Sequence, residues 1–227
     1  MENVNTNTKN TQDKVVLILS GGLDSTVLAY YLVSKGCEIR AVSFDYGQKH
    51  KKELQYAAET CLSLNIPHNI IDISTITSYI NNSALTGTGE IPEGHYEDES
   101  MKSTVVPFRN GIMLSIAIGY AENINYESVA IANHAGDHAI YPDCRPEFIV
   151  GINTAAIAGT YNKIKLIAPF MTINKAGIAR IGMELGVDFD KTWSCYKGND
   201  VQCGVCGTCV ERNEAIKEAL NDKFKVV

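Results

Sequence analysis

Ser20-Gly21-Gly22-Leu23-Asp24-Ser25 directly follows the apolar run Val15-Val16-Leu17-Ile18-Leu19, and this junction is the starting point for predicting the fold. An unbroken apolar run that ends in a glycine-rich turn is typical of a fully buried parallel strand. The residues after the turn place their apolar side chains on one helical face as far as Gly36, which predicts a helix that ends there. A strand, a tight turn and a helix are therefore expected in direct succession.

Such a junction is suited to binding phosphate. Adjacent glycines let the backbone approach an anion closely, and the N–H groups and dipole at the start of a helix favour negative charge. Ser20 and Ser25 add hydroxyl donors, and Asp24 adds a carboxylate of the kind that binds Mg²⁺ between phosphates. The stretch has neither the ending of a P-loop nor the spacing of a dinucleotide fingerprint. The alternative is an ordinary strand-to-helix turn.

Length and composition describe a globular chain with one main core. Its 227 residues are enough for a sizeable α/β domain and a small additional module. The net charge of −6 argues against a non-specific nucleic-acid surface. No apolar stretch approaches the roughly 20 residues of a membrane span, and no signal-peptide pattern opens the chain. We therefore expect a cytoplasmic protein without a membrane or nucleic-acid partner.

Strand-like and helix-like stretches alternate along the rest of the chain. Further strands are predicted at 38–44, 68–73, 129–132 and 164–167, and helices at 49–64, 109–123, 146–159 and 174–185. This alternation predicts an α/β fold, a parallel sheet with helices on both faces, whose ligands bind at the carboxyl ends of the strands. Residues 81–104 interrupt the pattern and are interpreted as a mobile flap beside the site.

Four of the seven cysteines lie close together near the C-terminus, at Cys195, Cys203, Cys206 and Cys209. A cytosolic chain rarely keeps disulfides, and four thiolates at this spacing suit a tetrahedral zinc site. An iron–sulfur cluster and a set of redox-active thiols are the alternatives. Four protein ligands leave no open position on zinc, so its predicted role is structural.

Composition divides the chain into three predicted segments. Residues 1–13 are rich in Asn and Thr and form a disordered leader. Residues 14–190 carry the alternating strands and helices of the α/β domain. Residues 191–227 form a zinc-binding module with a C-terminal helix.

A polar stretch follows the predicted fourth strand at the carboxyl edge of the sheet. Over residues 133–148 it reads NHAGDHAIYPDCRPEF, with carboxylates at Asp137 and Asp143, a cation at Arg145 and a proline that begins a helix. A solvated connector with capping residues is the alternative interpretation.

In this order along the chain, five motifs resemble the QueC family of 7-cyano-7-deazaguanine synthases, ATP pyrophosphatases with a pyrophosphate-binding loop (PP-loop). They are SGGLDS at 20–25, FDYGQ at 44–48, VPFRN at 106–110, GDHAIYPDCRPEF at 136–148 and C-x7-C-x2-C-x2-C at 195–209. The resemblance covers about residues 14–220. SGGLDS alone is typical of the superfamily, whereas YPDCRPEF together with the cysteines is more specific.

The resemblance implies an ATP-dependent ligase that forms a nitrile from 7-carboxy-7-deazaguanine and ammonia, through an adenylated carboxylate and an amide. It also implies Mg²⁺ with ATP, one structural Zn²⁺ per chain and a homodimer. The expected catalytic residues are Asp24, Arg109 and Lys175. The expected ATP-binding residues are Leu19, Ser20, Gly21, Gly22, Leu23, Asp24, Ser25, Thr26, Asp45, Tyr46 and Gln48. Asp137, Asp143 and Arg145 are expected to bind the substrate, and Cys195, Cys203, Cys206 and Cys209 the zinc.

Three other functions fit parts of this pattern. A related PP-loop enzyme could act on another carboxylate, and the motifs do not separate it from the first interpretation. A tRNA-thiolation enzyme needs a reactive cysteine, for which Cys144 is the only candidate near the expected site. A non-catalytic zinc-binding interaction module would leave the SGGLDS loop without a role.

Overall fold

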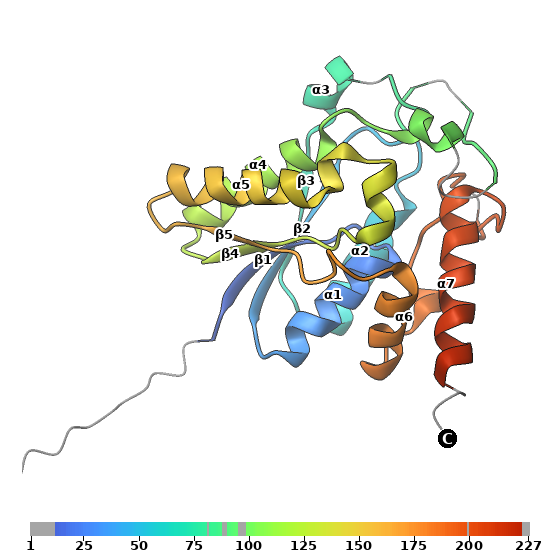
Figure 1. The fold of residues 1–227 in the computed structure, drawn as a ribbon. Coiled ribbons are helices and arrows are strands. Elements are labelled where there is room, and N and C mark those ends of the chain that lie inside the picture. Colours follow the sequence, from blue (N-terminus) through green and yellow to red (C-terminus); the bar gives the residue numbers. More distant parts are fainter. Residues whose placement is uncertain (1–11, 81, 88–89, 95–98, 199, 224–227) are drawn as a thin grey trace, which may run out of the picture.

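A computed structural model describes residues 12–80, 82–87, 90–94, 99–198 and 200–223. Five parallel strands form one sheet in the order β3-β2-β1-β4-β5 (Figure 1). The strands are β1 Lys14–Ile18, β2 Glu38–Asp45, β3 His68–Asp72, β4 Ser128–Ala130 and β5 Lys165–Ile167. The predicted fold class is confirmed. Residues 1–11 of the predicted leader lie outside the described residues.

The apolar run at 15–19 is buried because β1 lies in the middle of the sheet. It pairs with β2 on one side and with β4 on the other, so that Leu17 lies opposite both Ala41 and Ala130. Val15, Val16, Leu17 and Leu19 are fully buried. Helices cover both faces of this strand, which is why the run does not alternate with polar residues.

Helices form one layer on each face of the sheet. They are α1 Leu23–Ser34, α2 Lys52–Ser63, α3 Ser74–Thr77, α4 Arg109–Asn123, α5 Pro146–Gly159, α6 Lys175–Glu184 and α7 Gly207–Lys223. One core holds Leu28 of α1, Ala57 of α2 and Ile178 of α6, while the other holds Leu114 of α4 and Ile149 of α5. Helix α7 lies beside α6 at the end of the molecule (Figure 1). None of the described helices is long and apolar enough to cross a membrane.

The segment at 81–104 is only partly described, since residues 81, 88–89 and 95–98 lie outside the described residues. Its described parts pack against the domain. Leu85 and Met101 are buried, and the backbone N–H of Ala84 donates to the carbonyl of Ser103 at 2.7 Å. A 3-10 helix covers Glu99–Thr104. The predicted mobility of this segment stays a prediction.

The order of the strands reverses at β1. The chain runs outward from β1 to β2 and β3, then returns to place β4 and β5 on the other side. At such a switch point the connections after neighbouring strands leave in opposite directions and open a crevice at the carboxyl ends. Here the crevice lies between the loop after β1 and the loop after β4.

Candidate active site

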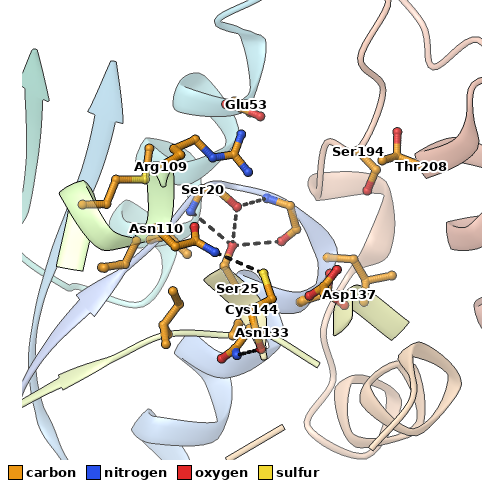
Figure 2. A pocket seen from close by; sticks show the side chains of 18 of the residues that line it. Ser20, Ser25, Glu53, Arg109, Asn110, Asn133, Asp137, Cys144, Ser194 and Thr208 are labelled. Carbon is orange, nitrogen blue, oxygen red and sulfur yellow. Dashed lines mark hydrogen bonds between the residues drawn. The ribbon is translucent and has the colours of Figure 1, made fainter. Parts of the chain in front are cut away.

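A cavity of about 230 Å³ lies at this crevice (Figure 2). Its walls come from the loop after β1, the ends of β2 and β4, the starts of α4 and α6, and the segment around the cysteines. Most of the predicted site residues outside the cysteine cluster line it: Leu19, Ser20, Gly22, Leu23, Asp24, Ser25, Tyr46, Arg109, Asp137 and Lys175.

The loop after β1 is ordered by hydrogen bonds of its own hydroxyls. Ser20 Oγ lies 2.9 Å from Ser25 Oγ and accepts a hydrogen bond from the Gly22 N–H at 3.3 Å (Figure 2). Gly22 is the N-cap of α1, and no side chain caps that helix. The first N–H groups of a helix have no acceptor within it, so they are left for an anion.

Gly21 is required where the loop meets α2. Its backbone has a φ of +84°, and a Cβ there would lie 2.7 Å from the amide nitrogen of Ala57 and closer still to the carbonyl oxygen of Glu53. Helix α2 therefore packs directly on the loop and brings the Glu53 carboxyl to the cavity wall. The pKa of Glu53 is raised to about 7, and burial is the largest of the influences on it.

Arg109 supplies positive charge at the start of α4. Its Nη1 donates to the hydroxyl of Tyr46 at 3.1 Å, and its guanidinium carbon lies 5.1 Å from the centre of that ring. Tyr141 and Tyr196 line the same part of the cavity. A guanidinium beside aromatic rings is suited to binding a planar or anionic group.

Lys175 and Asp24 form an ion pair in the opposite wall. Lys175 Nζ lies 3.3 Å from Asp24 Oδ2 and 2.5 Å from Glu211 Oε2. Burial alone would lower the pKa of Lys175, but Asp24, Glu211 and Asp137 together raise it well above its usual value, so the amine is protonated. Asp24 Oδ1 is buried and accepts no hydrogen bond from the described residues, as expected of an oxygen that can bind a cation.

His134 is buried among these carboxylates. Its Nδ1 accepts a hydrogen bond from the Gly136 N–H at 3.1 Å, so the neutral ring carries its proton on Nε2. Nε2 lies 3.6 Å from Asp137 Oδ1 and 3.9 Å from Asp24 Oδ2. The ring therefore presents an N–H group to the acidic side of the cavity.

The other predicted residues of the α/β domain do not line the cavity: Gly21, Thr26, Asp45, Gln48, Asp143 and Arg145. Gln48 is buried, and its Oε1 accepts from the Tyr46 N–H at 2.9 Å. Asp143 accepts from the Asn110 N–H at 2.8 Å, next to Arg109. The Nε of Arg145, an exposed residue, donates to the carbonyl of His138 at 2.9 Å.

Asp45 has partners of its own at the edge of the sheet. Its Oδ1 accepts from the Gly47 N–H at 3.1 Å, and its Oδ2 lies 2.5 Å from Lys51 Nζ. This ion pair leaves Asp45 beside the loop that carries Tyr46 rather than in the cavity wall.

Several cavity residues were not among those predicted. They are Glu53, Asn110, Asn133, Tyr141, Cys144, Trp193, Ser194, Tyr196 and Thr208. Asn110, Asn133, Tyr141 and Cys144 lie in or next to stretches already singled out, so their motifs carried a usable signal. The same holds for Thr208, which lies between Cys206 and Cys209. Glu53 carries no such signal, because only the packing of α2 brings it to the site.

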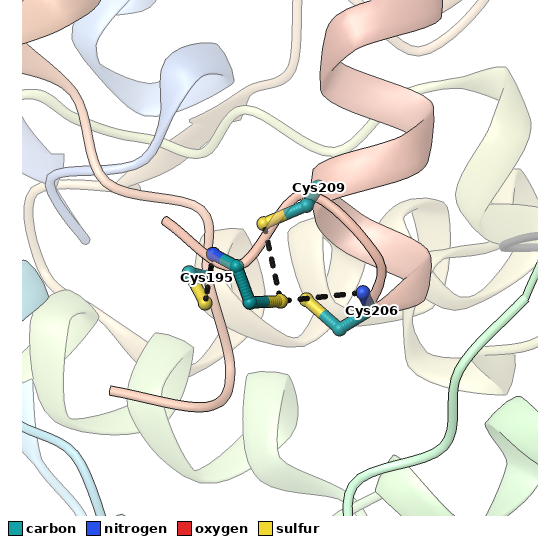
Figure 3. Close-up of side chains that lie close together, drawn as sticks. Cys195, Cys206 and Cys209 are labelled. Carbon is teal, nitrogen blue, oxygen red and sulfur yellow. Dashed lines mark hydrogen bonds between the residues drawn. The ribbon is translucent and has the colours of Figure 1, made fainter. Parts of the chain in front are cut away.

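The four clustered cysteines form a site that can hold a metal ion, as predicted. Their sulfur atoms all lie within 4.8 Å of one another (Figure 3). The backbone N–H of Cys206 donates to Cys203 Sγ at 3.3 Å, and that of Cys203 to Cys195 Sγ at 3.4 Å. A hydrogen bond from the Cys209 thiol, and then one from the Thr208 hydroxyl, lower the pKa of Cys206 and favour the thiolate that metal binding requires.

Comparison with known proteins gives a consistent result. The family model described as queuosine biosynthesis protein QueC matches residues 14–220. The chain is 48% identical over 206 residues to the 7-cyano-7-deazaguanine synthase of Alteromonas mediterranea, covering 91% of this chain and 94% of that protein. It is 50% identical over 206 residues to the synthase of Methanoregula boonei, covering 91% and 95%.

Solved structures support the fold alone. The NMN synthetase from Francisella tularensis aligns with a TM-score of 0.50 at 18% identity, covering 94% of this chain and 87% of the other. The NH3-dependent NAD synthetase from Campylobacter jejuni aligns with a TM-score of 0.50 at 19% identity, covering 96% and 79%. The parallel sheet and its covering helices are thus shared with proteins whose sequences are distant.

Proposed function

The chain belongs to the QueC family of queuosine biosynthesis proteins, and from this premise we propose that it makes 7-cyano-7-deazaguanine from 7-carboxy-7-deazaguanine, ammonia and ATP. Relatives that cover nine-tenths of the chain are named 7-cyano-7-deazaguanine synthase. The observation that carries the proposal is the single cavity that joins an anion-binding loop to two cationic side chains, Arg109 and Lys175.

The chemistry needs two activations of oxygen. In the first, the substrate carboxylate attacks the α-phosphorus of ATP, forming an acyl adenylate and releasing pyrophosphate. Ammonia then displaces AMP, and the amide forms with loss of a proton. In the second, the amide oxygen takes an adenylyl group from another ATP, again with release of pyrophosphate. Loss of AMP and a proton leaves the nitrile, so that each substrate oxygen departs on AMP.

The cavity residues fit the demands of these steps. The amides and hydroxyls of Ser20, Gly22 and Ser25 would hold the departing pyrophosphate, because preorganised donors stabilise charge as it develops. Lys175 and Arg109 would neutralise phosphate and carboxylate charge. Asp24 is the candidate for holding Mg²⁺, which would supply further neutralisation. The three carboxyl groups of this cluster, Asp24, Asp137 and Glu211, surround a single ammonium group, that of Lys175. The cluster therefore has negative charge left over to balance a bound Mg²⁺.

Tyr46 lines the cavity and is our candidate for contacting the adenosine, with Asp45 and Gln48 supporting its loop. A guanine-like ring presents N–H donors along one edge, and carboxylates accept from such donors. Asp137 and Glu53 reach the cavity and are the first candidates to read that edge. Asp143 accepts from the Asn110 N–H and would act by holding the start of α4 in place, whereas Arg145 is exposed and does not line the cavity.

We propose zinc as the metal of the cysteine site. At a zinc–sulfur distance of about 2.3 Å, the sulfurs of a tetrahedral site lie about 3.8 Å apart, and Cys203 Sγ and Cys209 Sγ lie 4.0 Å apart. An iron–sulfur cluster would spread its cysteines more widely, because each binds a different iron atom. Measuring metal content and absorption of the purified protein tests this assignment.

Two related proposals are open to simple tests. The family resemblance implies a homodimer, which sedimentation would detect.

Thiolation of tRNA is disfavoured because burial, with a contribution from Asp137 and Asp143, raises the pKa of Cys144 well above its usual value. A buried, protonated thiol is a poor nucleophile.

The first experiment is mass spectrometry of a reaction that contains the protein, ATP, Mg²⁺, isotope-labelled ammonium and 7-carboxy-7-deazaguanine. We expect a nitrile that carries the labelled nitrogen, together with AMP and pyrophosphate. ATP turnover without the nitrile would reject this substrate and direct the search to other carboxylates.

Asp24→Asn tests the role of the phosphate loop. We expect a loss of ATP consumption of at least about a hundredfold, the usual size for removing a charge that stabilises the transition state, with the fold intact. Asp13→Asn is the matched control, because Asp13 is exposed before β1. Full activity of Asp24→Asn would reject the assignment.

A further inference from the structure

The segment around the cysteines supplies part of the cavity. We call Trp193, Ser194, Tyr196 and Thr208 the cysteine wall, since all four line the cavity next to a cysteine of the cluster or within two residues of one. The Trp193 backbone N–H donates to the carbonyl of Gly21 at 2.9 Å, and its indole N–H donates to the carbonyl of Cys195 at 2.9 Å. One residue thus links the phosphate loop to the cysteine cluster.

Glu211 makes a second link, through side chains. It lies in the first turns of α7, just after Cys209, and its Oε2 is 2.5 Å from Lys175 Nζ. Lys175 is the first residue of α6 and in turn lies 3.3 Å from Asp24 Oδ2. Helices α6 and α7 pack side by side (Figure 1). Glu211, Lys175 and Asp24 therefore form one continuous chain of ion pairs that starts two residues after Cys209.

Lys175 needs a partner other than Asp24. Its side chain is only 10% exposed and starts from a helix N-terminus, where the dipole disfavours a cation. When Asp24 binds the cation that accompanies the triphosphate, the charge of its carboxylate is partly neutralised. The attraction between Asp24 and Lys175 then becomes weaker. Glu211 faces Lys175 from the other helix and remains available as a counter-ion. It can hold the ammonium at the cavity wall throughout the reaction.

We propose that Glu211 is a positioning residue that holds Lys175 toward the nucleotide phosphates. The inference rests on the proposed function only in taking ATP as the ligand of this cavity. It concerns nucleotide binding and does not depend on which carboxylate is activated.

The direction in which ATP affinity changes in Glu211→Gln distinguishes a positioning role from simple charge repulsion. A carboxylate that acted only through its charge would repel the triphosphate, so that Glu211→Gln would tighten ATP binding. A carboxylate that positions Lys175 has the opposite effect: its loss lets the ammonium turn away, and binding weakens.

The experiment measures MgATP affinity through the fluorescence of Trp193, the one tryptophan of the chain, which lies in the cavity wall. For Glu211→Gln we expect the dissociation constant to rise at least tenfold, with bound metal and melting temperature unchanged. Glu211→Asp should recover part of the loss. Glu218→Gln, at an exposed position on the same helix, is the matched control and should bind as the wild type does.

A double-mutant cycle with Lys175→Met completes the test. If Glu211 acts through Lys175, adding Glu211→Gln to Lys175→Met weakens binding no further. Additive losses, tighter binding by Glu211→Gln or a change below twofold would each overturn the proposal. Failure of the wild-type protein to bind MgATP would instead overturn the proposed function, so the two failures are distinct.

Discussion

The two sides of the cavity are built in different ways. The sheet wall, which includes Ser20, Glu53, Arg109 and Asn133, stands on strand ends and helix starts that a buried apolar core supports. In the cysteine wall, Trp193, Ser194 and Tyr196 belong to no helix or strand, and Thr208 lies in the first turn of α7. That wall packs as a small apolar cluster in which Trp193 is buried with Cys195, Cys206 and Cys209. The hydrogen bond from Trp193 to Gly21 ties it to the phosphate loop. The sheet wall thus rests on the two large apolar cores of the domain, and the cysteine wall on a small separate cluster that the cysteines themselves help to form. The two walls should therefore fail separately.

Gly21→Ala should break the sheet wall and have the largest effect. The added methyl group must displace α2, and the backbone must keep a left-handed conformation that alanine disfavours. We expect a loss of about 4 kcal/mol or more in the free energy of unfolding, the size of a severe core mutation. Urea denaturation followed by circular dichroism measures it.

Gly36→Ala is the matched control for the backbone. Gly36 has a φ of +75° at the end of α1, but a Cβ there would have no atom within 4 Å. Only the left-handed conformation is then penalised, at about 1–2 kcal/mol. Equal losses for the two variants would show that contact with α2 does not constrain the loop.

Cys206→Ser should break the cysteine wall and spare the sheet. We expect loss of bound metal and about 2–3 kcal/mol of stability, the scale of losing a local structural site. Trp193, now 4% exposed, should shift its emission to the red, while circular dichroism of the sheet and its helices persists. Cys37→Ser, outside the cluster, should retain metal and emission. A metal-free variant with unchanged Trp193 emission would contradict this picture and our proposal that residues 191–227 form a separate module.

The contrast also explains what could be predicted from the sequence. The strand at 15–19, the glycine turn and the cysteine spacing are local patterns, and the structure places each as expected. Helices 109–123 and 146–159 have the predicted bounds, because a left-handed Phe108 and a proline at 146 set their starts. Glu53 and Glu211 could not be found this way. Their roles depend on how α2 packs on Gly21 and α7 on α6, and such long-range packing leaves no mark in the neighbouring sequence.

Glu53→Gln tests the buried carboxyl of the sheet wall through pH. Because the folded pKa is raised to about 7 from an ordinary value of 4.5, the folded state holds a proton that the unfolded state releases. Wild-type stability should therefore fall as pH rises from about 4.5 to about 7, and stay reduced above it. A pKa shift of this size changes the free energy of unfolding by about 3 kcal/mol for a fully buried group. Because Glu53 is partly exposed, solvent screening reduces the expected change to about 1–2 kcal/mol.

The variant should equal the wild type near about pH 4 and exceed its stability by that amount near about pH 8. Urea titrations at both pH values measure the difference. Glu59→Gln, at an exposed position of the same helix α2, should leave the pH dependence unchanged. Parallel pH profiles for Glu53→Gln and the wild type would mean that the carboxyl is ionised in the folded protein.

Arg109 and Arg145 give the finest comparison, since both were predicted to bind ligand and only Arg109 lines the cavity. Losing a hydrogen bond to a charged group costs about 1.5–3 kcal/mol, so Arg109→Ala should raise the KM for ATP or the carboxylate at least about tenfold. Arg145 is exposed, and its Nε donates to the carbonyl of His138. Arg145→Ala should then change either KM less than about twofold and stability by at most about 0.5 kcal/mol. A tenfold rise for Arg145→Ala would mean that the substrate reaches beyond the sheet wall to the 3-10 helix at Pro142–Cys144, and that this loop closes over the ligand.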